Sequence, residues 1–172
     1  MNFPKSETAR PKIMIIYTGG TIGMIENRET GALQPFDFTH LIDNVPKIKK
    51  LDYVILGNHY DTTDELQIYY GRVCNDDEEM IRYIDGCIEG MSTGIYSYLA
   101  HPDLFMRSRK KFDDLARSES YRLCKWCKEN HVILEYNLEG ARFCHERGVD
   151  WYPYPEFWKI AAEEGNSVII GI

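Results

Sequence analysis

Three polar side chains that could take part in catalysis or metal binding come at the ends of short apolar runs. His59, His101 and Glu135 each follow or end such a run, and short apolar runs bounded by loop residues predict buried strands. If these strands are parallel, their carboxyl ends meet at one edge of a sheet, where α/β folds gather their chemistry. Imidazoles and carboxylates gathered there are typical ligands of divalent metals. We therefore expect His59 and His101 to converge, with ring nitrogens within about 8 Å of each other.

Each of these residues also has a structural interpretation. A single histidine after a strand is most often a hydrogen-bonded loop residue, and only the repeated position of His59 and His101 makes the functional interpretation equally strong. Glu135 could be held by a buried arginine, because a buried carboxylate must be paired or solvated. Arg107 and Arg142 follow the same segments and could bind a phosphate through bidentate contacts, although the sequence favours the simpler interpretation that both are solvated.

The elements that would position these residues alternate between strands and helices. From residue 53 onward, short apolar runs alternate with segments of helical periodicity, which favours parallel strands with right-handed crossovers. This order predicts an α/β fold, either a barrel or an open sheet. The expected strands cover residues 12–17, 53–56, 95–100, 132–134 and 167–172, and the expected helices cover 37–45, 75–91, 110–130 and a segment that begins at Pro155 and ends near Gly165.

Composition narrows the class of partners. The chain has 172 residues and a formal net charge of −7, so no basic surface is expected that would displace counterions from nucleic acid. The sequence has no apolar run of about 20 residues that could cross a bilayer, and its polar first residues do not resemble a secretory signal. The five cysteines are an odd number at irregular spacing, which favours reduced thiols and a cytoplasmic protein.

Cysteine and histidine spacing leaves two further possibilities open. Cys124 and Cys127 form a Cys-x-x-Cys pair inside a predicted helix, which disfavours a redox role because such pairs act at helix N-termini. With Cys144 and His145 they could form a structural zinc site. Alternatively, His145 could lie on a long loop and join the histidine site.

Residues 52–172 resemble the histidinol-phosphatase branch of the polymerase-and-histidinol-phosphatase (PHP) domain family. The matching stretches are Val-Ile-Leu-Gly-Asn-His ending at His59, Tyr-Leu-Ala-His-Pro-Asp ending at Asp103, Leu-Glu-Tyr-Asn ending at Asn137, and Tyr-Pro-Glu-Phe-Trp ending at Trp158. The resemblance implies a distorted (β/α)7 barrel that holds divalent zinc, manganese or iron and hydrolyses a phosphate monoester such as histidinol phosphate. It also implies that His59 and His101 are metal ligands, and that Glu135, Asn137 and Asp103 lie beside them.

Two motifs of that family have no counterpart in this sequence. The family has a His-x-His pair on its first strand and an Asp-x-His motif after a strand like 168–172, and this sequence contains neither string. The resemblance therefore implies an incomplete phosphoesterase.

Residues 12–51 resemble the N-terminal segment of bacterial-type L-asparaginases. The string Ile-Tyr-Thr-Gly-Gly-Thr-Ile-Gly at residues 16–23 follows an expected buried strand, and the resemblance implies that Thr21 is the nucleophile. Glycines keep such a turn tight, so that the hydroxyl stands clear of the strand. The family's second motif, Gly-Thr-Asp-Thr, is not in the sequence, and Thr21 is expected to lack an activating lysine or aspartate. We take the likeness of Asp61-Thr-Thr-Asp64 to the family's substrate-binding element as coincidence.

Together these observations predict two enzyme fragments joined near residue 51. Residues 1–51 would be an asparaginase-like fragment, with a strand, turn and helix from a different α/β fold, and residues 52–172 a partial PHP-type barrel. The leading hypothesis is a metal-dependent phosphoesterase that is incomplete, and the alternatives are an L-asparaginase fragment or a non-catalytic chimeric remnant. We expect the strand at 12–17 to dock as an edge strand beside 53–56, because an uncovered sheet edge favours aggregation, or else the N-terminal segment to stay poorly ordered.

Overall fold

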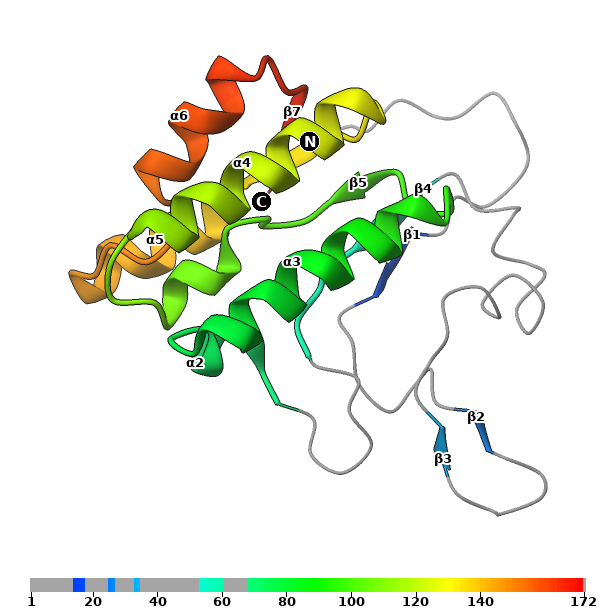
Figure 1. Ribbon diagram of the computed structural model, residues 1–172, viewed down its shortest axis with the longest axis horizontal. Coiled ribbons are helices and arrows are strands. Elements are labelled where there is room, and N and C mark those ends of the chain that lie inside the picture. The colour runs from blue at the N-terminus through cyan, green and yellow to red at the C-terminus, as the bar shows by residue number, and fades with distance from the viewer. Residues whose placement is uncertain (1–13, 18–24, 27–32, 35–52, 61–67, 172) are drawn as a thin grey trace, which may run out of the picture.

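The computed structural model describes residues 14–17, 25–26, 33–34, 53–60 and 68–171. Its main sheet has five parallel strands in the order β1-β4-β5-β6-β7, and Figure 1 shows how they run through the molecule. A separate antiparallel pair joins β2 (Ile25–Glu26) to β3 (Leu33–Gln34). The main strands are β1 (Met14–Tyr17), β4 (Tyr53–Leu56), β5 (Tyr98–Leu99), β6 (Leu134–Asn137) and β7 (Val168–Gly171).

The predicted α/β class with parallel strands is confirmed. β1 docks as an edge strand on β4, with Tyr17 opposite Leu56, as expected for the segment at 12–17. This pairing joins the two expected fragments in one sheet. Among the described strands, β1 and β7 stand at the two ends of an open order, so the barrel remains a hypothesis. The expected helix at 37–45 and the side chains of the first strand lie outside what the structure describes.

Two of the helices begin where an aspartate side chain satisfies free backbone N–H groups. Asp76 accepts hydrogen bonds from the backbone N–H groups of Glu78 and Glu79 at the start of α3, and Asp113 accepts one from Ala116 at the start of α4. Such caps satisfy donors that have no partner within the helix. The helices are α2 (Tyr70–Val73), α3 (Asp77–Ser92), the 3-10 helix η3 (Leu104–Arg107), α4 (Asp114–Glu129), α5 (Leu138–Arg147) and α6 (Pro155–Glu163).

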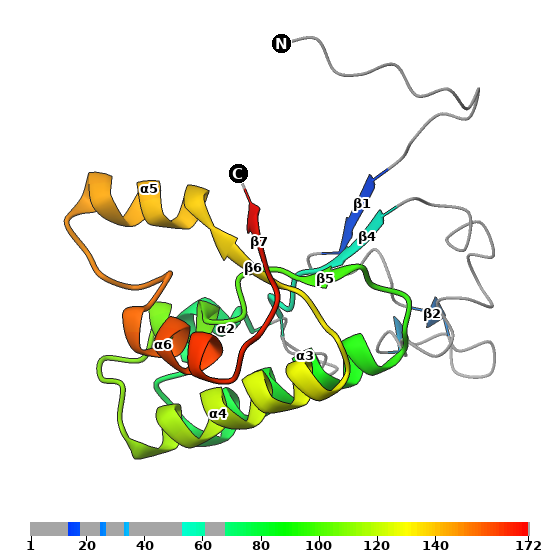
Figure 2. The same cartoon turned by 90° about the horizontal axis from the view of Figure 1, so that it is seen from above.

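Helices α3, α4 and α6 lie on one side of the sheet and α5 lies on the other (Figure 2). The core fills the space between the strands and the layer formed by α3, α4 and α6. It explains the apolar stripes of the sequence, because one face of each helix must be buried against the sheet. Its fully buried side chains include Leu56, Met80, Tyr83, Ile84, Leu99, Phe105, Leu123, Leu134 and Phe157.

The segment after β6 was expected to be a loop, and this expectation is wrong. α5 forms there, capped by Asn137, whose side-chain oxygen accepts a hydrogen bond from the backbone N–H of Gly140. Gly148 ends it with φ = 63°, a conformation that glycine adopts without strain. α5 was missed because only Gly140 and Cys144 are buried, which leaves little apolar periodicity. His145, expected on a long loop, lies in its last turn.

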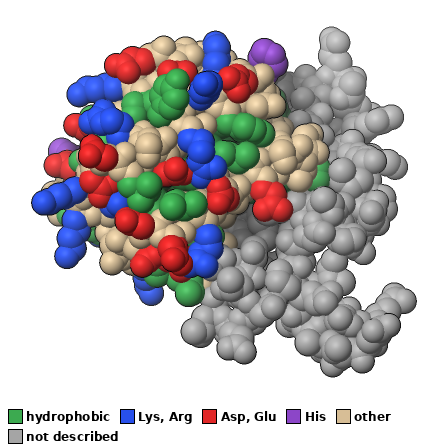
Figure 3. Space-filling model, viewed as in Figure 1, with side chains coloured by type: hydrophobic (Ala, Val, Ile, Leu, Met, Phe, Trp, Pro, Cys, Tyr) green, Lys and Arg blue, Asp and Glu red, His purple; other side chains and the backbone are tan. Residues whose placement is uncertain are grey.

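The surface carries charges of both signs. Acidic and basic side chains are interspersed over the face seen in Figure 3. None of the helices in the described part of the chain is both long and apolar enough to span a bilayer.

Candidate functional site

The two histidines converge at the carboxyl ends of β4 and β5. His59 Nε2 lies 2.9 Å from His101 Nε2, and the rings stack with centroids 4.7 Å apart and an interplanar angle of 11°. The expected convergence is therefore confirmed. Parallel pairing of β4 and β5 explains the convergence, because the residues that follow the two strands leave the sheet at the same edge.

Hydrogen bonds hold the backbone of His101 at both its N–H group and its carbonyl oxygen. Its φ of 32° lies in the left-handed region, which is uncommon for a residue with a side chain. Its N–H donates to Glu135 Oε2 at 3.0 Å. Its carbonyl oxygen accepts from the Tyr83 hydroxyl at 3.0 Å and from the Leu104 backbone N–H at 3.0 Å. Such convergence of contacts is what holds a residue in a sparsely populated conformation.

Glu135 and Asn137 lie beside the pair, on β6. The Asn137 side-chain amide donates to Glu135 Oε2 at 3.3 Å, and Glu135 is buried. A buried arginine was one expected partner of Glu135, but the partners found are this amide and the His101 backbone. A Cβ atom at Gly171 would collide with the Glu135 carboxylate, so glycine on β7 makes room for it.

At least one histidine of the pair is neutral. Burial, and then the nearby His59, lower the pKa of His101 to about 3, so His101 carries no charge near pH 7. His101 Nδ1 is buried and has no hydrogen-bond partner among the described residues. One Nε2 atom must donate and the other accept across the 2.9 Å contact.

The pair fits part of a metal site. Two ligand nitrogens of a tetrahedral zinc ion lie about 3.3 Å apart, given bonds of about 2.0–2.1 Å, and 2.9 Å between the Nε2 atoms is close to this. However, the described residues contain no group of three His, Cys, Asp or Glu side chains that could hold a metal. A site of two imidazoles does not satisfy a tetrahedral ion, so the described residues do not complete the expected metal centre.

The cysteines take part in packing. All five are buried and free, and Cys124 and Cys127 lie within α4 as expected. Burial is the largest cause that raises the pKa of the Cys124 thiol, to about 12, and burial also raises that of Cys127 well above its usual value. Thiols of this kind are inert.

Asp103 holds α6 in place. Its Oδ2 accepts from the Tyr154 backbone N–H at 2.6 Å and from Trp158 Nε1 at 3.0 Å. The side chain is 1% exposed, and burial raises the pKa of Asp103 to about 6 against the opposing effect of these donors. Asp103 thus fixes the helix that follows the site.

The two candidate arginines differ. Arg107 donates to the Tyr69 hydroxyl at 3.0 Å, and the Tyr69 ring centroid is 6.0 Å from that of His59, so Arg107 is one aromatic ring away from the pair. Arg142 instead pairs with Glu139 at 2.8 Å and Glu146 at 3.7 Å on its own exposed helix face. The solvated interpretation therefore suits Arg142.

Sequence reasoning missed Tyr83 and Tyr69. Tyr83 lies on the buried face of α3, at the spacing of the core residues, so nothing in the sequence separates its hydroxyl from ordinary packing. Tyr69 and Tyr70, which precede Gly71, also form no sequence pattern that indicates a functional role. Thr21 and Asp61–Asp64 lie outside the described residues.

One family model, described as "Asparaginase, N-terminal", matches residues 12–84. No curated protein and no solved structure matches the chain. The match supports the asparaginase resemblance of the N-terminal segment and extends it beyond residue 51, over Asp61–Asp64 and into α3. The phosphatase resemblance of the later residues rests on its motifs alone.

Proposed function

We propose that the chain is a hydrolase of the asparaginase type, which cleaves the side-chain amide of asparagine with Thr21 as the nucleophile. The observation that supports this proposal is the family match over residues 12–84. It includes the Thr-Gly-Gly-Thr-Ile-Gly string.

The sheet topology supports a joint site. β1 and β4 are parallel neighbours, Thr21 follows β1 in the sequence, and His59 follows β4. In the proposed reaction the Thr21 hydroxyl attacks the amide carbon, and His59 accepts its proton. The proton then passes to the leaving nitrogen, so that ammonia departs and water releases aspartate. His59 would thus take the place of the family motif that this sequence lacks.

The substrate would be held by the Asp61-Thr-Thr-Asp64 segment. It lies inside the matched range, so we now propose it as the counterpart of the family's substrate-binding element and set aside the interpretation as coincidence. Its carboxylates would attract the α-ammonium group of the substrate.

Release of ammonia from L-asparagine tests the proposal. Thr21→Ala should reduce the rate to background, while Thr21→Ser retains a hydroxyl and part of the activity. Ser118→Ala is a matched control, because the exposed Ser118 hydroxyl donates to the Leu115 carbonyl oxygen within its own helix, α4. Equal rates in the wild type and Thr21→Ala would refute the proposal.

A second candidate is phosphate monoester hydrolysis, favoured by the 2.9 Å approach of His59 and His101. The substrate would be a small phosphate such as histidinol phosphate, and the site would use divalent zinc, manganese or iron. Release of phosphate that depends on added metal and is lost in both His59→Ala and His101→Ala would support it. A chain silent in both assays would be the non-catalytic remnant. In either case we propose a cytoplasmic protein with a small-molecule substrate and neither nucleic acid nor membrane as partner.

A further inference from the structure

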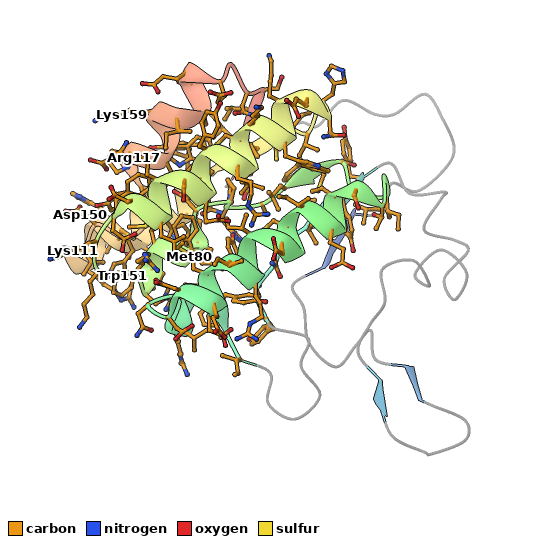
Figure 4. The ribbon with its side chains drawn as sticks, viewed as in Figure 1. Met80, Lys111, Arg117, Asp150, Trp151 and Lys159 are labelled. Carbon is orange, nitrogen blue, oxygen red and sulfur yellow. The ribbon has the colours of Figure 1, made fainter. Side chains whose placement is uncertain are left out.

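An open cavity of about 440 Å³ is lined by the loop that joins α5 to α6 and by residues of both helices. This volume is in the range of about 300–1,000 Å³ that is usual for small-ligand sites. The side chains that could recognise a ligand there are His145, Asp150, Trp151, Tyr152, Tyr154 and Glu156. Figure 4 labels Asp150 and Trp151 at this end of the molecule.

The charge of the cavity wall is negative. Asp150 and Glu156 contribute carboxylates, and the described residues that line the cavity include neither lysine nor arginine. Burial, then the charges of Glu156 and Asp150, raise the pKa of the Tyr154 phenol. Both carboxylates therefore act on the same wall, which would attract a cation and repel an anion.

The other walls are aromatic and held in place. Tyr154 stacks on Phe112 with ring centroids 5.5 Å apart, and its backbone N–H is bound by Asp103 at 2.6 Å. The carbonyl oxygen of Tyr152 accepts from Cys144 Sγ at 3.3 Å. Fixed aromatic rings attract cations over their faces.

One of these rings already contacts a cation of the chain itself, because the Arg107 guanidinium lies 5.4 Å from the centroid of Trp151. Arg107 is not a lining residue; its charge offsets part of the negative charge of the wall, and the two carboxylates exceed it. A divalent metal is a poorer candidate ligand for the cavity, because the described residues contain no group of three metal-ligating side chains.

We propose that this cavity binds a small organic cation, such as a protonated amine or a quaternary ammonium, through Asp150, Glu156 and the aromatic walls. The cavity adjoins the histidine pair, because the Tyr152 ring centroid lies 6.3 Å from that of His101. Its test measures binding without turnover, so its outcome can be told apart from that of the proposed hydrolysis.

The test uses benzylamine, which is protonated at neutral pH, and its neutral analogue benzyl alcohol. The indole N–H signal of Trp151, assigned with Trp151→Phe, reports binding at the cavity in the full-length chain. Benzylamine should shift this signal saturably, and benzyl alcohol should bind about tenfold more weakly. Asp150→Asn and Glu156→Gln should each weaken benzylamine binding by about two- to fivefold.

Glu163→Gln is the matched control, because Glu163 is exposed at the far end of α6, the helix that carries Glu156. It should leave binding unchanged. Equal affinity for benzylamine and benzyl alcohol would overturn the proposal. So would unchanged binding in the Asp150 and Glu156 variants, or tighter binding of inorganic phosphate than of benzylamine.

Discussion

Replacing Asp103 by asparagine should change how stability depends on pH. The carboxyl is 1% exposed, and burial raises its pKa from 3.8 to about 6. The folded state therefore binds this proton more tightly than the unfolded state, and stability falls as pH rises from the unfolded pKa through the folded one. A shift of about two units corresponds to roughly 3 kcal/mol lost above the folded pKa.

Asparagine is neutral at every pH and keeps an oxygen that can accept from Tyr154 and Trp158. The free energy of unfolding of Asp103→Asn, relative to wild type, should thus rise by about 2–3 kcal/mol between about pH 4 and pH 7.5. Urea denaturation at a series of pH values, followed by circular dichroism, measures this difference. A packing effect of the amide that does not depend on pH leaves this result unchanged, because the prediction concerns only how the difference in unfolding free energy varies with pH.

Parallel stability curves for the two proteins would refute the reasoning. Asp103→Ala separates the two roles of the side chain, because it removes both the charge and the acceptor. It leaves two donors unpaired near α6 and should cost about 1–3 kcal/mol for each.

The remaining predictions concern the hydrogen bond to the His101 carbonyl, the packing of Gly171 against Glu135, and edge strand β7. Tyr83→Phe removes the donor to the His101 carbonyl and should lower the free energy of unfolding by about 1 kcal/mol in urea denaturation, whereas Tyr121→Phe on the exposed face of α4 should not. Gly171→Ala should destabilise by about 1–3 kcal/mol in the same assay, because its Cβ would collide with the Glu135 carboxylate; an unchanged midpoint would contradict the close packing. Ile170 is 65% exposed on edge strand β7, so Ile170→Lys should reduce concentration-dependent light scattering; equal scattering would show that this edge does not drive association.

The alternation of parallel strands with helices and the histidine pair could be predicted from the sequence because both follow from local patterns. Apolar runs bounded by loop residues gave β4, β5 and β6, and parallel pairing then required His59 and His101 to meet. α5 could not be predicted, because its buried side is made of Gly140 and Cys144, which leave no apolar stripe.

The surroundings of the pair were also beyond the sequence. Tyr83 reaches the His101 carbonyl from another helix, and the Glu135 carboxylate is accommodated by Gly171 on β7. Both contacts depend on tertiary packing between distant segments, which residue spacing does not encode.

Ammonia release from L-asparagine, compared between wild type and Thr21→Ala, is the measurement that tests the proposed function most directly. The proposal predicts measurable release by wild type and a loss of about 100-fold or more in the variant, since the nucleophile is removed. His59→Gln should also lose activity if His59 accepts the proton. Absence of release by wild type, or release that Thr21→Ala leaves unchanged, would contradict the proposal that this chain is an asparaginase-type hydrolase.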